Sequence, residues 1–292
     1  MAAKEDEKTA AAERDSLPVR LGGPVLEKFT DPETWIGCLQ RLGYRAAYCP
    51  VGPEAEDKLV RACEAAAKEA DITIAETGAW SNPVNPDETK RRAALETCRQ
   101  SLALADRIGA RCCVTTAGTR DSSSPGSGPH PGNLTEDTFD LIVESVRSVI
   151  DQVKPTRSFF CLETMPYAQP DSPDCYLRLL EAVDRKSFAA HLDPVNMISS
   201  PQRYYRNADF IRECFARLGP YLRSCHAKDT LIQKKLTVHI DEVRPGLGEL
   251  DYLTYLRELS RYPGVPLMLE HLETDAEYAL AAKYIRAVAK KL

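Results

Sequence analysis

Apolar runs of strand length recur along this chain, and longer segments with a helical spacing of apolar residues separate them. Short apolar runs bounded by turn-forming residues are typical of buried strands. Eight runs fit this description: residues 19–21, 44–50, 72–78, 111–117, 158–163, 188–193, 222–226 and 267–270. Strands that alternate with helices in this way indicate a parallel sheet.

Helical patterns fill the intervals between the strands. Residues 138–150 carry the clearest apolar stripe, formed by Phe139, Ile142, Val143, Val146, Val149 and Ile150. Shorter stripes are formed by Tyr252, Tyr255, Leu256 and Leu259, and by Leu280, Tyr284, Ala287 and Val288. Asp31-Pro32 and Asn207-Ala208-Asp209 are typical helix starts with a capping side chain. Eight alternating units without a break in composition predict an α/β fold, a single-domain (β/α)₈ barrel over residues 17–292.

Three irregular stretches interrupt the alternation, and each follows a predicted strand. Residues 118–133 are rich in Gly, Ser and Pro, residues 166–173 follow the fifth strand, and residues 230–248 follow the seventh. Loops after the strands of such a barrel shape its substrate pocket. We therefore expect these three loops to surround the site.

Composition narrows the class of protein further. The net charge is −5, so no global basic footprint predicts a nucleic-acid partner. No apolar run approaches the roughly 20 residues that span a bilayer, and residues 1–16 are charged and Ala-rich, which predicts a flexible leader. The ten cysteines include no Cys-x-x-Cys pair and are expected to be small buried side chains in a reducing compartment. A cytoplasmic enzyme without membrane contact is the expectation.

Four potential metal ligands stand at the ends of four successive strands: Glu163, Asp193, His226 and Glu270. An interval of roughly 30 residues is one strand plus one crossover helix. The carboxyl ends of barrel strands are where such enzymes build their sites. The spacing therefore predicts that these four side chains converge.

A mixed set of carboxylates and one imidazole suits a hard or borderline divalent ion. We expect one such ion, Mn²⁺ before Mg²⁺, Co²⁺ or Zn²⁺. A substrate with adjacent hydroxyl and carbonyl groups could complete the coordination, and the metal would then acidify the neighbouring C–H. One carboxylate could take that proton and another could return one.

Flanking residues are candidates for substrate binding. Lys228 should share the inward side of His226, with an ion pair to Asp229 as the alternative. His191 should share the inward face of Asp193, where it could hydrogen-bond a ligand or the substrate, with a core residue as the alternative. Asn196 could orient a ligand or a substrate hydroxyl. His271 should point the other way from Glu270.

Several motifs resemble the sugar phosphate isomerase/epimerase family, the xylose isomerase-like TIM barrel superfamily that includes ketose 3-epimerases and inosose dehydratase. They are Leu162-Glu163-Thr164, His191-Leu192-Asp193-Pro194-Val195-Asn196, Cys225-His226-Ala227-Lys228-Asp229, Arg244-Pro245-Gly246-Leu247-Gly248-Glu249 and Leu269-Glu270-His271. The resemblance implies that Glu163, Asp193, His226 and Glu270 hold the metal. It also implies that Glu163 and Glu270 are the catalytic acid/base pair on opposite faces of a sugar.

Two further residues and one departure refine this picture. Arg244, ahead of the Pro-Gly-x-Gly turn, is a candidate substrate contact, and Trp80 is a candidate stacking platform for an apolar sugar face. The ketose 3-epimerases usually carry His where this chain has Asn196, which leaves room for other chemistry.

The predicted function is a metal-dependent isomerase or epimerase that removes a proton next to the carbonyl of a ketose or keto-sugar through a metal-stabilised enolate. The alternative is a dehydratase or lyase acting on a keto-cyclitol or keto-glycoside. Minor alternatives are a non-catalytic sugar-binding barrel and a nuclease like the apurinic endonucleases, whose three-zinc site needs more His than the five present. Barrels of this class often pair, so a homo-oligomer is compatible with the sequence.

Overall fold

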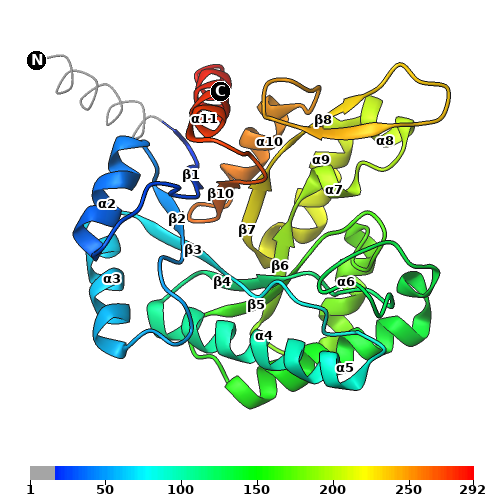
Figure 1. Ribbon diagram of the computed structural model, residues 1–292. Helices are drawn as coiled ribbons and strands as arrows, with labels where there is room; N and C mark the ends of the chain where they lie inside the picture. The colour runs from blue at the N-terminus through cyan, green and yellow to red at the C-terminus, as the bar shows by residue number, and fades with distance from the viewer. Residues whose placement is uncertain (1–16) are drawn as a thin grey trace, which may run out of the picture.

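Eight parallel strands close into a barrel in the computed structural model, which describes residues 17–292 (Figure 1). Around the barrel the strands follow the order β1-β10-β7-β6-β5-β4-β3-β2. Their bounds are β1 (Arg20–Gly23), β2 (Ala46–Tyr48), β3 (Thr73–Gly78), β4 (Cys112–Thr115), β5 (Phe159–Glu163), β6 (Phe188–Leu192), β7 (Leu222–Ala227) and β10 (Pro266–Leu269). The predicted single-domain (β/α)₈ barrel is confirmed, whereas the expected leader of residues 1–16 lies outside the described residues.

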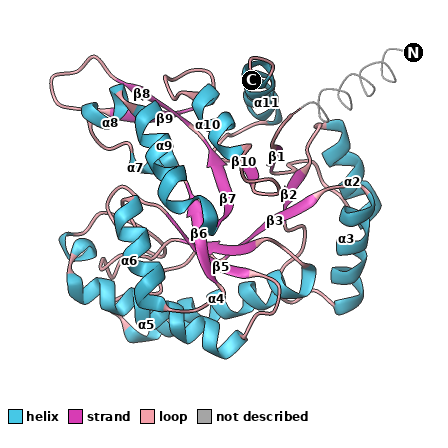
Figure 2. Ribbon diagram, turned by 180° about the vertical axis from the view of Figure 1, so that it is seen from behind, coloured by secondary structure: helices cyan, strands magenta, loops and turns pink. Residues whose placement is uncertain are grey.

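Helices cover the outside of the barrel, as the view from behind shows (Figure 2). The long ones are α2 (Pro32–Arg41), α3 (Asp57–Glu69), α4 (Glu88–Ile108), α5 (Glu136–Val153), α6 (Pro173–Val183), α9 (Asn207–Leu218), α10 (Tyr252–Leu259) and α11 (Asp275–Ala289). Short turns of helix are η1 (Pro131–Leu134), α7 (Pro194–Met197), α8 (Pro201–Tyr205) and η2 (Gly219–Tyr221). No described helix is long and apolar enough to cross a membrane.

Local chemistry explains where the helices begin. Asp31 caps α2 by accepting a hydrogen bond from the Thr34 backbone N–H at 2.8 Å, and the Thr34 hydroxyl accepts one from the Asp31 N–H. The predicted cap at Asn207 is wrong, although α9 does begin there. Its amide donates to the Tyr204 and Glu249 carbonyls instead, so Asn207 fastens a loop to the helix.

The stripe predicted for the last helix is also partly wrong. In α11 the buried residues are Tyr278, Ala281, Ala282, Ile285 and Val288, while Leu280 is 46% exposed. The spacing of the buried set is helical, but alanines supply two of its members. Alanine stands out little among apolar residues, so the larger Leu280 gave the misleading signal.

Two irregularities in strand register decide which side chains enter the barrel. Ala47 lies opposite Ile74 but Tyr48 lies opposite Glu76, so β3 has one extra residue there, Ala75. A second shift between β6 and β7 pairs His191 with Ser224. An extra residue in a strand changes which side chains face the interior. Both shifts direct polar side chains into the barrel interior, nearer its carboxyl end than small residues such as Cys112, Cys161 and Ala189.

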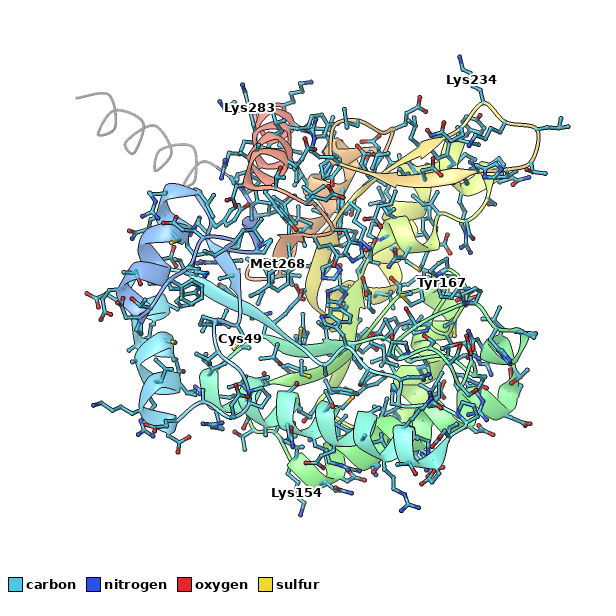
Figure 3. The ribbon with its side chains drawn as sticks, viewed as in Figure 1. Cys49, Lys154, Tyr167, Lys234, Met268 and Lys283 are labelled. Carbon is cyan, nitrogen blue, oxygen red and sulfur yellow. The ribbon has the colours of Figure 1, made fainter. Side chains whose placement is uncertain are left out.

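The described cysteines behave as the sequence predicts. All ten thiols are free, and every one except Cys49 is buried. Met268 also lies inside the ring of strands, where it packs against Ala46 and Ala75 (Figure 3). Inside the barrel, Met268, Cys112 and Cys161 therefore fill space together with small alanine side chains.

The stretch after the seventh strand is not an irregular loop, contrary to prediction. It contains an antiparallel hairpin of β8 (Asp229–Ile232) and β9 (Ile240–Val243) that projects from the barrel (Figure 1). Each strand spans four residues, which is too short for alternation to separate it from a loop in the sequence. The loop of residues 118–133 is irregular as predicted up to the short η1 turn.

Candidate metal centre and active-site pocket

The four predicted ligands converge at the carboxyl end of the barrel. One ligand atom from each of Glu163, Asp193, His226 and Glu270 lies within 4.8 Å of the others. His226 Nδ1 lies 2.8 Å from Glu163 Oε1, 2.9 Å from Glu270 Oε1 and 3.8 Å from Asp193 Oδ2. The strands β5, β6, β7 and β10 are neighbours around the barrel, which is why residues far apart in sequence meet here.

The two oxygens of the Asp193 carboxylate have different partners. Oδ1 accepts hydrogen bonds from the backbone N–H groups of Val195 at 2.9 Å and Asn196 at 3.2 Å, and so caps α7. Asp193 Oδ2 and Glu270 Oε1 are also buried, and each faces the Lys228 ammonium, at 3.0 and 2.7 Å. Buried carboxylate oxygens gathered beside one imidazole nitrogen fit a hard or borderline divalent cation.

Below the four ligands lies a carboxylate that sequence reasoning missed, Glu76. Its Oε2 lies 3.4 Å from His226 Nε2, its Oε1 lies 3.0 Å from His191 Nε2, and the Ser224 hydroxyl donates to it. A carboxylate behind a metal-ligating histidine fixes the orientation of the ring. The position of Glu76 at the end of the third strand was visible in the sequence, but the register shift that turns it inward was not.

His191 is placed by the structure beneath the pocket. Its ring is fully buried, contacts Glu76 and meets the His226 ring edge-on, with ring centroids 4.1 Å apart. It does not line the main pocket. Of the two alternatives for His191, the geometry favours support of His226 over direct contact with substrate.

The charges of the centre are interdependent. Burial alone would lower the pKa of His226, but Glu270, Glu76 and other neighbours raise it well above its usual value. Burial raises the pKa of Asp193 to about 6, against the opposing effect of Lys228. The pKa of Glu270 is lowered because His226 and Lys228 outweigh the effect of burial. Clustered acids with divergent pKa values are typical of functional sites.

Lys228 joins the carboxylates to the hairpin. Its Nζ lies 2.7 Å from Glu270 Oε1, 3.0 Å from Asp193 Oδ2 and 3.3 Å from Glu242 Oε2 on β9. The alternative ion pair with Asp229 is wrong. Asp229 instead accepts hydrogen bonds from backbone N–H groups of the following turn, including those of Gly246 and Leu250.

A pocket of about 690 Å³ opens above this centre. Glu163, Glu270, Lys228, Asn196 and Trp80 line it, and they are joined by Pro24, Tyr48, Thr116, Ser127, Met165, Pro166, Tyr167, Glu242, His271 and Tyr278. The Asn196 amide donates to Glu163 Oε1 at 3.3 Å, and the Asn196 carbonyl oxygen accepts from Lys228 at 3.2 Å. Trp80 is 53% exposed, so its ring is available to a ligand.

Two predicted orientations differ from the structure. Arg244 does not line the pocket, because its Nε lies 2.7 Å from Glu277 Oε2 on α11. His271 does line the pocket, although strand alternation predicted that it would point away. The left-handed backbone at His271, with φ of 58°, breaks the alternation, and its Nδ1 lies 3.0 Å from Glu242 Oε1.

Two buried asparagines hold the Gly/Ser/Pro loop beside the pocket. Asn133 Oδ1 accepts from the Arg120 N–H at 2.8 Å, and its amide donates to the Gly128 and Tyr167 carbonyls at 2.8 and 3.1 Å. Asn82 donates to the Thr119 carbonyl at 2.9 Å. The predicted pocket loop is therefore fastened by side-chain hydrogen bonds despite its composition.

Comparison with known proteins agrees with this architecture. The family model of the xylose isomerase-like TIM barrel matches residues 39–288. No curated protein matches the sequence. Three solved structures illustrate the likeness in fold. A xylose isomerase-like TIM barrel protein from Mycobacterium smegmatis in complex with magnesium has 17% identity and a TM-score of 0.66, with 94% of this chain and 97% of that chain covered.

The second is D-psicose 3-epimerase with D-tagatose from Clostridium cellulolyticum H10, at 18% identity and a TM-score of 0.66, with 92% of this chain and 99% of that chain covered. The third is endonuclease IV from Thermus thermophilus, at 12% identity and a TM-score of 0.69, with coverage of 94% and 100%. Identities this low establish the fold alone, whereas the family model spans most of the sequence. This chain belongs to the xylose isomerase-like TIM barrel family.

Proposed function

We propose that the protein is a divalent-metal-dependent sugar isomerase or epimerase that removes a proton next to the carbonyl of a ketose or keto-sugar. The observation that carries the proposal is the convergence of Glu163 and Glu270 on His226 Nδ1, at 2.8 and 2.9 Å, at the base of one pocket. Two carboxylates at one reaction centre can remove a proton and return one.

Each residue has a role in this scheme. Glu163, Asp193, His226 and Glu270 hold the ion, for which Mn²⁺ is the first expectation. When bound, the ion polarises the substrate carbonyl and acidifies the adjacent C–H. Glu163 and Glu270 then take up and deliver the proton.

Lys228, Asn196 and Trp80 orient the substrate. Lys228 and Asn196 both line the pocket, and the Lys228 ammonium donates to Asn196 Oδ1 at 3.2 Å. The exposed ring of Trp80 offers a face on which the C–H groups of a sugar can stack. A hydroxylated substrate therefore meets both polar and apolar partners.

A dehydratase or lyase is the second candidate, and Asn196 favours it. Its amide donates to Glu163 Oε1, whereas the ketose 3-epimerases usually carry at this position a histidine that helps to bind the substrate. Solved structures of similar fold include epimerases and a probable 3-DHS dehydratase. Both reactions begin with the same proton removal, and they differ in whether a leaving group is then expelled.

The test is incubation of the Mn²⁺-loaded protein in D₂O with a panel of ketoses and keto-cyclitols, read by NMR and mass spectrometry. We expect solvent deuterium to enter next to the carbonyl, and Glu163→Gln and Glu270→Gln should each reduce that exchange at least about 100-fold. Glu273→Gln, an exposed glutamate three residues beyond Glu270, is the matched control and should exchange normally. If neither deuterium uptake nor product is detected across the panel, proton-removal chemistry is refuted.

A further inference from the structure

A second hollow of about 320 Å³, which we call the groove, adjoins the main pocket. The two share three lining residues, Pro166, Asn196 and Glu242, so a ligand can extend from one into the other. Asn196 and Glu242 both contact Lys228, at the polar reaction centre. The second hollow therefore begins where the proposed chemistry takes place.

Apolar side chains from two segments contribute to the walls of this hollow. Val195 and Ile198 supply one side, from α7 and the residue after it. Val238 and Ile240 supply the other, from the β8–β9 hairpin. These four apolar side chains line the hollow together with polar ones such as Ser199 and Thr230, and the carboxylates and the ammonium group of the centre lie in the main pocket. A ligand that fills both spaces can therefore place a polar part at the centre and an apolar part against these four side chains.

The β8–β9 hairpin carries apolar residues both inside and outside the groove. Val238 lines the groove and is still 58% exposed, so part of its apolar surface is open to a ligand. Leu236 is fully exposed near the tip of the same hairpin and lines neither space. Lys234, also near the tip, points outward (Figure 3).

The volume of the main pocket exceeds what a simple sugar needs. Its 690 Å³ corresponds to about 23 water molecules at about 30 Å³ each, roughly twice the number of non-hydrogen atoms in a hexose. Pockets of ~300–1,000 Å³ usually hold ligands of drug size. An unsubstituted ketose would leave the apolar groove in contact with water.

We propose that the groove is a binding site for an apolar substituent, such as an aryl group, attached to the sugar-like substrate. This inference rests on the proposed function, because the sugar part is placed at the centre formed by Glu163 and Glu270. The substituent would lie between α7 and the β8–β9 hairpin, against Ile198 and Val238. The substrate class is then a keto-sugar or glycoside with an apolar aglycone, larger than a free ketose.

The experiment compares matched ligands by titration calorimetry with the Mn²⁺-loaded protein: phenyl against methyl β-D-glucopyranoside, and phenyl against methyl β-D-galactopyranoside. Burial of a phenyl group should make at least one phenyl glycoside bind about tenfold or more tightly than its methyl counterpart. Val238→Ser and Ile240→Ser should each reduce that ratio, while Leu236→Ser on the same hairpin should leave it unchanged. Circular dichroism and light scattering of each variant report folding and oligomeric state.

Three results would overturn the inference. The first is equal affinity of the phenyl and methyl glycosides, or no measurable binding of either phenyl glycoside at millimolar concentration. The second is a phenyl preference that survives both groove substitutions. The third is a change of oligomeric state in Val238→Ser with unaltered glycoside affinity, which would make the groove a contact between copies. Deuterium exchange into small ketoses with no phenyl preference would overturn only the groove. A phenyl preference without exchange on any substrate would overturn only the proposed chemistry.

Discussion

Replacing Glu76 with glutamine tests whether the buried carboxylate beneath His226 tunes the metal centre. The substitution keeps the size of the side chain and removes its charge. Burial would raise the pKa of Glu76, but His191 and His226 lower it, so the native side chain is a carboxylate that accepts from both rings. A glutamine presents an N–H group to at least one of these partners, and two donors then face each other.

The expected cost follows from the geometry. Loss of a carboxylate partner behind a metal-ligating histidine typically weakens metal affinity about 10–100-fold. The contact between Glu76 Oε2 and His226 Nε2 is 3.4 Å, longer than the roughly 2.9–3.0 Å of a strong hydrogen bond. We therefore expect the lower end for Glu76→Gln, about a tenfold loss of Mn²⁺ affinity or ~1.4 kcal/mol.

The assay is calorimetric titration with MnCl₂, accompanied by the thermal unfolding midpoint of the metal-free protein. Glu258→Gln is the matched control, because Glu258 is another buried glutamate, paired with Arg261 far from the centre. Should Glu76→Gln bind Mn²⁺ within about twofold of the native protein, Glu76 would not position His226. Ser224→Ala, which removes only a donor to Glu76, provides a milder test if the first variant folds poorly.

Three further predictions concern the pocket and its supports. Asn133→Ala should lower the free energy of unfolding by about 2–3 kcal/mol, because the substitution leaves several backbone groups of the loop unpaired. Chemical denaturation measures this free energy, and a loss under about 0.5 kcal/mol would contradict the prediction. Trp80→Ala should raise KM about tenfold with stability nearly unchanged, and a drop in kcat alone would argue against a stacking role. Burial opposes ionisation of Asp106, but the backbone N–H groups of Arg157, Ser158 and Thr156 lower its pKa below 3.8. Its charge therefore stabilises the fold above that pH and loses this effect as pH falls through the folded-state pKa. Asp106→Asn should cost about 1 kcal/mol at pH 7, and the difference from the native protein should shrink below about pH 4; a constant difference would refute the account.

The barrel could be predicted because its signals are local. Each of the eight barrel strands overlaps a predicted apolar run, and the Thr138–Ile150 stripe lies within α5. The short β8–β9 hairpin could not be predicted in this way, because four alternating residues carry too little signal. The stripe of α11 was misplaced because its buried alanines resemble surface residues.

Some residues of the candidate site could likewise be predicted from local sequence signals, and others could not. The sequence by itself determined the four residues at the strand ends, since strands of one parallel barrel all finish at the same rim, and any acidic or imidazole group there is brought near the others. Only the tertiary structure decided which groups stand behind and beside them. A register shift turns the Glu76 side chain into the barrel, and the left-handed backbone of His271 turns its side chain toward the pocket. Arg244 points away from the pocket and pairs with Glu277. The first two outcomes depend on a single extra residue and a backbone angle, which reverse the direction of a side chain without leaving a periodic trace in the sequence, and the third depends on a partner that tertiary packing brings near.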